Sequence, residues 1–259
     1  MSSSDTPQYE QRRAFFDQML TVYGRKPVLE ALQDSALPAF KLHLADSNRS
    51  EGIIEQIKNL AEQRSVPVAF HDRRALSRIS RNGKQDQGVA LDLQLPSYRH
   101  YSELLPLQNH ARLVALDRVT NPQNLGMIIR SVSASGISGL ILPKNGCASL
   151  SPLVIKASAG TLFKAPIYYC DQLESCLSEL REAGSEVYGL SSHASASVFA
   201  QGTPGPAVYV LGNETEGLSA SLGRLCTSQL RIPMHNGVES LNVAVTAAII
   251  AFAAQNSAT

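Results

Sequence analysis

Two polar loops of this chain, each closing a hydrophobic strand, carry residue types that could hold and orient a substrate. VLGNETEG (210–217) contains Glu214, and IPMHNGVESLN (232–242) contains Ser240 and Asn242. Carboxylate, hydroxyl and amide groups all form directed hydrogen bonds. Polar groups and exposed backbone at the carboxyl ends of parallel strands typically build a binding site. The two loops therefore predict two walls of one site.

The same residues also have an ordinary structural explanation. IPMHNGVESLN gives way to the apolar run VAVTAAIIAFAAQ, and Ser or Asn before such a run commonly caps the N-terminus of a helix. Glu214 could stabilise a helix that starts near Leu218, because a carboxylate is favourable beside a helix N-terminus. From these loops alone, capping and substrate contact both remain open.

A third polar segment, NPQNLGMIIR (121–130), follows the strand-like run RLVALD and contains Asn124 and Arg130. Arg130 falls in an otherwise apolar helical pattern. Either its long side chain reaches solvent from the rim of the helix, or its guanidinium binds an anion such as phosphate through two parallel hydrogen bonds. The segment is compatible with both roles.

The elements that must position these segments alternate between strands and helices. From Arg112 onward the alternation predicts a parallel sheet. A smaller alternation precedes it, with strands expected at 41–45, 66–70 and 87–93 and helices at 50–64 and 71–80. We expect an α/β chain in four parts: a helical extension at 1–22 with an amphipathic helix over 8–22, a small α/β domain at 23–95, a linker at 96–110 and a parallel-sheet domain at 111–259.

Composition and missing motifs exclude several classes of protein. A net charge of +1 gives no global argument for nucleic-acid binding, and the four cysteines lack the spacing of a zinc site or a disulfide framework. The sequence lacks GxGxxG after the first strand of the parallel-sheet domain, and it lacks GxxxxGK[ST] and GxSxG altogether. The N-terminus does not resemble a signal peptide, and the longest apolar run is too short to span a bilayer. We expect a cytoplasmic protein without a metal.

Taken together, the three polar segments resemble the three motifs of the SpoU (TrmH-like) RNA ribose 2′-O-methyltransferases of the SPOUT superfamily. YGRKPVLEAL (23–32) and QGVAL (87–91) are similar to the substrate-binding domain that precedes many such enzymes, which has a fold like certain ribosomal proteins. The resemblance implies transfer of a methyl group from S-adenosylmethionine to a ribose 2′-hydroxyl of RNA, with ribosomal RNA preferred and transfer RNA as the alternative. It further implies a deep trefoil knot in the C-terminal domain and a homodimer.

The resemblance also implies roles for individual residues. The family's cofactor-binding positions fall on Leu211, Gly212, Ile232, Met234 and Leu241. The positions used for catalysis and substrate binding fall on Asn124, Arg130, Glu214, Ser240 and Asn242. Because a guanidinium is effectively always protonated, Arg130 is better suited to stabilise a forming alkoxide or hold a phosphate than to act as a base. Thr215 departs from the family, which more often has Gly there.

RNA contact is predicted locally, in the small N-terminal domain. HDRRALSRISRNGK (71–84) contains Arg73, Arg74 and Arg78 beside a single acid, and Arg25 and Lys26 could extend the same surface. Such a run is either a solvated helix face or a phosphate-binding surface. Two other functions are alternatives: a non-catalytic RNA-binding protein on the same scaffold, and a nucleotide-dependent oxidoreductase, whose glycine fingerprint this sequence lacks.

Overall fold

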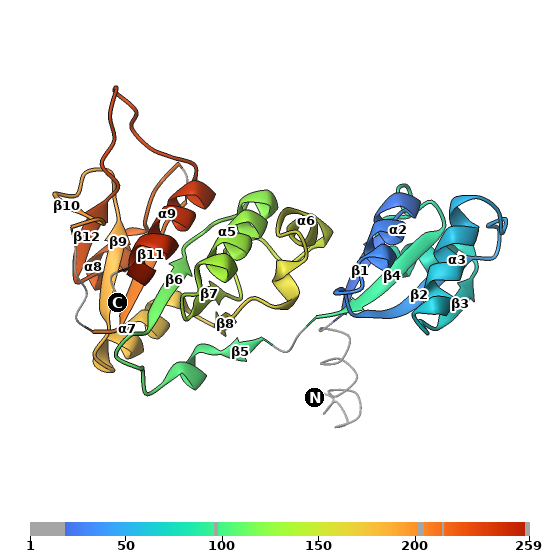
Figure 1. Ribbon diagram of the computed structural model, residues 1–259, viewed down its shortest axis with the longest axis horizontal. Coiled ribbons are helices and arrows are strands. Elements are labelled where there is room, and N and C mark those ends of the chain that lie inside the picture. The colour runs from blue at the N-terminus through green and yellow to red at the C-terminus, as the bar shows by residue number, and fades with distance from the viewer. Residues whose placement is uncertain (1–18, 96–97, 201–204, 214, 257–259) are drawn as a thin grey trace, which may run out of the picture. The chain divides into compact units, whose positions relative to one another are not determined.

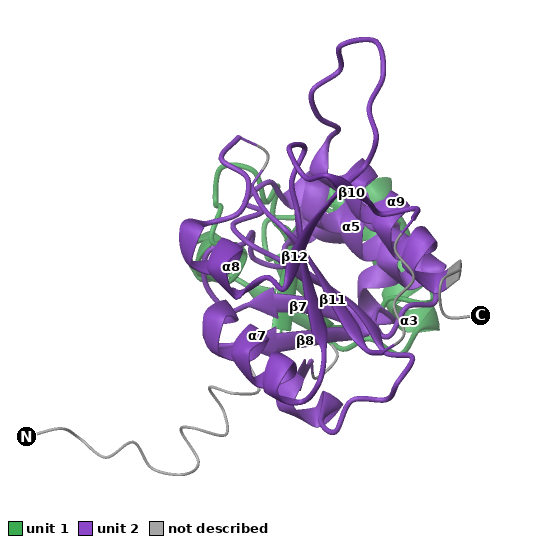
Figure 2. Cartoon of the chain, turned by 90° about the vertical axis from the view of Figure 1, so that its left-hand side faces the viewer, with its two compact units in different colours: residues 1–97 green, residues 98–259 purple. Residues whose placement is uncertain are grey.

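The computed structural model describes residues 19–95, 98–200, 205–213 and 215–256. The chain divides into two compact units, residues 1–97 and 98–259 (Figure 2). No helix in the described ranges is long and apolar enough to cross a membrane.

The first unit is a four-stranded sheet with helices packed on it (Figure 1). Its strands lie in the order β1-β4-β2-β3, with β2 and β3 parallel and the other pairs antiparallel. The buried positions of α3, Ile54, Ile57 and Ala61, recur at helical spacing and close the core over the sheet. The elements are β1 (Met19–Tyr23), α2 (Arg25–Gln33), β2 (Ala39–Ala45), α3 (Ile53–Gln63), β3 (Val68–His71), α4 (Arg73–Ser80) and β4 (Val89–Gln94).

The start of this unit differs from the helix expected over 8–22. Met19–Tyr23 is a strand that pairs along its whole length with β4, from Met19 beside Gln94 to Tyr23 beside Ala90. Its residues include Thr21, Val22 and Tyr23, which are β-branched or aromatic and fit a pleated surface. The remainder of that predicted helix lies outside the described residues. The small domain thus includes a strand that the sequence assigned to the preceding extension.

The second unit contains the parallel sheet that the alternation predicted. Its strand order is β10-β12-β9-β11-β6-β7-β8-β5, and every described pair in it is parallel. The strands are β5 (Arg99–His100), β6 (Arg112–Leu116), β7 (Gly139–Pro143), β8 (Ile167–Cys170), β9 (Glu186–Leu190), β10 (Ala196–Ser197), β11 (Ala207–Leu211) and β12 (Ser228–Arg231). The helices are α5 (Pro122–Ser135), α6 (Pro152–Ala157), α7 (Leu173–Glu182), α8 (Ala220–Leu225) and α9 (Val243–Asn256), with short 3₁₀ helices η1 (Tyr101–Leu104) and η2 (Thr161–Phe163).

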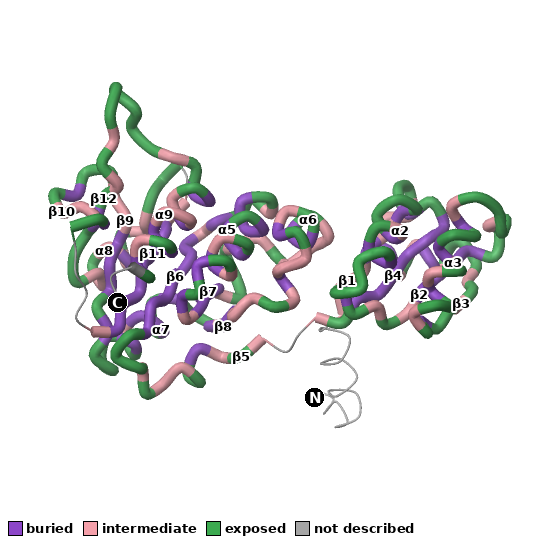
Figure 3. The backbone as a smooth tube through the Cα atoms, viewed as in Figure 1, coloured by how far each residue is buried: buried purple, intermediate pink, exposed green. Residues whose placement is uncertain are grey.

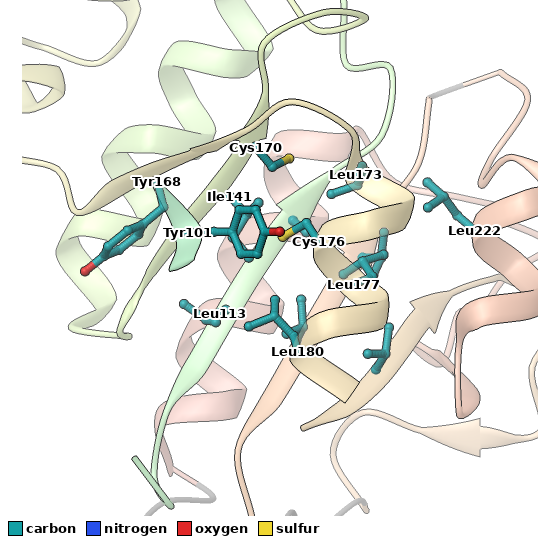
Figure 4. Packing of buried hydrophobic residues seen from close by; sticks show 14 residues of the cluster. Tyr101, Leu113, Ile141, Tyr168, Cys170, Leu173, Cys176, Leu177, Leu180 and Leu222 are labelled. Carbon is teal, nitrogen blue, oxygen red and sulfur yellow. The ribbon is translucent and has the colours of Figure 1, made fainter. Parts of the chain in front are cut away.

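Helices sandwich this sheet, and its central strands are buried (Figure 3). On one face α7 and α8 place Leu173, Leu177, Leu180 and Leu222 against the strands (Figure 4). α9 packs against α5 and against β6 and β11. Tyr101 of η1 is also buried in this core, between α7 and the sheet.

The predicted linker is therefore partly structured. β5 pairs with β8 at the edge of the large sheet, and η1 anchors Tyr101 in the core. A two-residue strand is too short to show a period in the sequence, which is why this stretch resembled a linker.

Candidate functional site

A cavity of about 580 Å³ lies at the carboxyl ends of β9, β11 and β12. Parallel strands deliver three loops to this edge, at 190–193, 212–219 and 232–242. A volume in this range suits a small-molecule cofactor. The residues predicted to bind the cofactor all line the cavity, and they are Leu211, Gly212, Ile232, Met234 and Leu241.

The loop after β11 folds tightly back on itself at Gly212. Asn213 and Gly217 exchange two backbone hydrogen bonds, of 3.1 and 2.9 Å, and the Asn213 Oδ1 accepts from the backbone N–H groups of Thr215 and Glu216. A Cβ on Gly212 would lie 2.2 Å from the carbonyl carbon of Gly217. Only glycine fits this close approach of two backbone segments.

Two residues at the end of β6 hold this loop in place, and the sequence did not assign them to the site. The buried Asp117 accepts a hydrogen bond of 2.9 Å from the Ser219 backbone N–H, and its other oxygen contacts Arg118 Nε at 3.2 Å. Arg118 pairs with Glu216 and donates to the Gly217 carbonyl at 3.1 Å. Its own carbonyl accepts from Asn213 Nδ2 at 3.1 Å. The available signal was an acidic residue directly after a buried parallel strand.

Asn124 and Asn242 come together from segments 118 residues apart. Asn242 Nδ2 donates to Asn124 Oδ1 at 3.1 Å, and Asn242 Oδ1 accepts from the Ala244 backbone N–H at 2.8 Å. Asn242 therefore caps α9 and contacts a second candidate residue at once, so the two interpretations of this loop are compatible. Asn121 caps α5 in the same way, through the N–H groups of Gln123 and Asn124.

The other candidate catalytic residues are distributed unevenly. Ser240 lines the cavity with the cofactor residues. Arg130 is exposed on α5 and is absent from the residues that line the cavity. Six residues after Asn124, it lies about 240° around the helix from that side chain. Glu214 lies outside the described residues. His193, an exposed loop residue, also lines the cavity.

The candidate RNA-binding cations lie in the first unit, and all five are exposed: Arg25 and Lys26 at the start of α2, and Arg73, Arg74 and Arg78 on α4. The loop after β2 connects the two helix starts. Arg25 Nη2 donates to Asn48 Oδ1 at 3.4 Å, and the Asp46 N–H donates to the His71 carbonyl just before α4 at 2.9 Å. The starts of α2 and α4 therefore share one end of the small sheet.

Comparison with known proteins covers both units. The family model described as the SpoU rRNA Methylase family matches residues 111–252, and one described as RNA 2′-O ribose methyltransferase substrate binding matches residues 21–99. A protein of Mycolicibacterium vanbaalenii, described as an uncharacterized tRNA/rRNA methyltransferase, is 34% identical over 233 residues, covering 88% of this chain and 74% of the relative.

Solved structures give the same result. The AdoMet-bound rRNA methyltransferase of Sinorhizobium meliloti is 27% identical, with a TM-score of 0.64, over 99% of this chain and 97% of that one. A structure described by the 2-OH methylation of C/U34 on tRNA is 26% identical, with a TM-score of 0.52, and covers 57% of this chain and 96% of the other.

Proposed function

Because the chain belongs to the SpoU rRNA methylase family of RNA methyltransferases, we propose that it transfers a methyl group from S-adenosylmethionine to a ribose 2′-hydroxyl of RNA. The observation that carries this proposal is the cavity at the strand ends, because it is bordered by the cofactor residues, by Ser240 and by the tightly folded loop after β11. The substrate-binding match over residues 21–99 supports RNA as the partner.

The cavity residues fit S-adenosylmethionine by their chemistry. Leu211, Ile232, Met234 and Leu241 offer apolar contact for an adenine ring, and Gly212 allows close approach to the backbone. The Sinorhizobium meliloti relative is described as AdoMet-bound, which supports the same cofactor here. The cofactor supplies an electrophilic methyl group, so the protein has to position and activate a ribose hydroxyl.

The candidate catalytic residues divide that work. Ser240, which lines the cavity, orients the ribose, and the hydrogen bond between Asn242 and Asn124 supports the end of the loop that carries Ser240. Glu214 completes the set as a contact for a polar group of the substrate. Arg130 stays protonated and serves as an electrostatic group, holding a phosphate of the RNA beside the site.

We further propose a homodimer that covers the exposed face of α9 and α5. α9 is apolar on all sides, a pattern typical of helices that are fully buried. Yet Val245 and Phe252 on α9 are 47% and 50% exposed, and Met127 on the neighbouring α5 is 41% exposed. A second copy of the chain would remove this apolar surface from water.

We propose ribosomal RNA of the cytoplasm as the substrate, with transfer RNA as the alternative. The test is incubation of total RNA with labelled S-adenosylmethionine and fractionation of the RNA by size. Label in the large RNAs supports the ribosomal substrate, and label in the transfer RNA fraction supports the alternative. RNA binding without any transfer of label would favour a non-catalytic RNA-binding protein instead.

A further inference from the structure

A chain of hydrogen-bonded side chains crosses all four strands of the first unit. Thr21 of β1 donates to Asp92 Oδ1 of β4 at 2.7 Å, Asp92 Oδ2 lies 3.0 Å from His43 Nε2 of β2, and His43 Nδ1 lies 2.9 Å from His71 Nε2 of β3. His43 and Asp92 are 6% and 9% exposed, whereas His71 is only half-buried, at the edge strand. No spacing in the sequence indicates this network, which we call the histidine relay.

The proton positions in the histidine relay follow from the charge that each member carries. An ionised carboxylate only accepts hydrogen bonds, so His43 must carry its proton on Nε2. Burial opposes ionisation of Asp92, but hydrogen bonds from His43 and Thr21 outweigh it and lower its pKa. In the relay with a neutral His43, its Nδ1 accepts, which places the proton of His71 on Nε2 and leaves the His71 Nδ1 as an acceptor.

Partial burial favours the neutral form of His71. It lowers the pKa of His71, and the nearby Lys41 lowers it further, while Asp46 and Asp72 oppose them. No described residue donates to His71 Nδ1. The histidine relay therefore presents a hydrogen-bond acceptor of defined polarity at the edge of the sheet.

The position of this acceptor indicates its partner. His71 lies two residues before Arg73, and the loop that contacts its carbonyl also contacts Arg25. Cations of this kind hold phosphates, which offer no donor, but each ribose beside them carries a 2′-hydroxyl that can donate. We propose that His71 Nδ1 accepts a hydrogen bond from a ribose 2′-hydroxyl of the bound RNA. The inference rests on the proposed function for its ligand, and it makes Asp92 and His43 positioning residues.

Binding of the full-length protein to a short RNA hairpin and to its 2′-fluoro counterpart tests this contact. The 2′-fluoro strand keeps the ribose shape but lacks the donor. One hydrogen bond of ordinary strength predicts about fivefold tighter binding of RNA, measured by fluorescence anisotropy. His71→Phe should abolish that preference, because it weakens binding of the 2′-hydroxyl strand and leaves binding of the 2′-fluoro strand unchanged. The control variant His110→Phe, at an exposed position, should keep the preference. Equal weakening for both strands, or no weakening, would overturn the proposal.

A second measurement does not depend on any variant folding. In ¹⁵N spectra of the imidazoles at neutral pH, His43 and His71 should each carry the proton on Nε2, and added RNA hairpin should shift the His71 Nδ1 signal. A proton on His71 Nδ1 would contradict the assigned direction of the histidine relay, and an unshifted signal with RNA bound would overturn the proposed contact. Neither readout requires methyl transfer, so an inactive protein that passes both would refute only the proposed function.

Discussion

Gly212→Ala should open the loop that closes the cofactor cavity. The added methyl carbon would lie 2.2 and 2.3 Å from the carbonyl carbon and oxygen of Gly217 and 2.4 Å from the Leu218 nitrogen. These atoms are all backbone, so the two backbone segments must separate, which breaks the pair of hydrogen bonds between Asn213 and Gly217. At about 1 kcal/mol for each bond, the loss is about 2 kcal/mol.

The assay is calorimetric titration with S-adenosylmethionine, with thermal unfolding measured in parallel. If binding requires the closed loop, about 2 kcal/mol corresponds to roughly 30-fold weaker affinity. Gly223→Ala is the matched control, because its Cβ meets nothing within 4 Å and it lies in α8 beside the same cavity. An unchanged affinity in Gly212→Ala would show that cofactor binding does not require the closed loop. An equal loss of affinity in both variants would mean that the added methyl group fills the cavity and does not act by opening the loop.

Three further perturbations test separate parts of the structure. Asn242→Ala removes both the cap of α9 and the bond to Asn124, so it should cost about 1 kcal/mol of stability and abolish methyl transfer; full turnover would contradict its role. Arg64 donates to four carbonyls around the end of α2, those of Ala31, Leu32, Asp34 and Leu37. Arg64→Met should therefore lower the free energy of unfolding by about 2 kcal/mol, measured by urea denaturation. Lys58→Met, the control, should change it little. Phe252→Glu places a charge on the exposed face of α9 and should yield a monomer in sedimentation experiments; a monomeric unaltered protein would remove the proposed dimer.

The sequence predicted the parallel sheet because its buried strands are continuous apolar runs such as AVYVL, separated by helical patterns. The residues that the family resemblance assigned to the cofactor all line one cavity, and their contact with S-adenosylmethionine stays a prediction. The sequence missed Met19–Tyr23, whose strand conformation is stabilised by pairing with β4, over sixty residues away. The secondary-structure propensity of the segment contains no information about a pairing strand so far along the chain.

Side-chain networks were beyond sequence reasoning for the same reason. Asp117 and Arg118 act on a loop about a hundred residues later, and the histidine relay takes one residue from each of four strands. Their function depends on the register between strands, which no local spacing encodes. By contrast, the separation of Asn124 and Arg130 is local: six residues apart on one helix, they do not share a face, and Arg130 is exposed.

Alkaline hydrolysis of the labelled RNA product tests whether the methyl group is transferred to a ribose 2′-oxygen. Alkaline cleavage of RNA needs a free 2′-hydroxyl, so a methylated ribose protects the adjoining phosphodiester bond. We expect the label to be recovered in alkali-resistant dinucleotides. Label recovered in mononucleotides would place the methyl group on a base and contradict the proposed reaction.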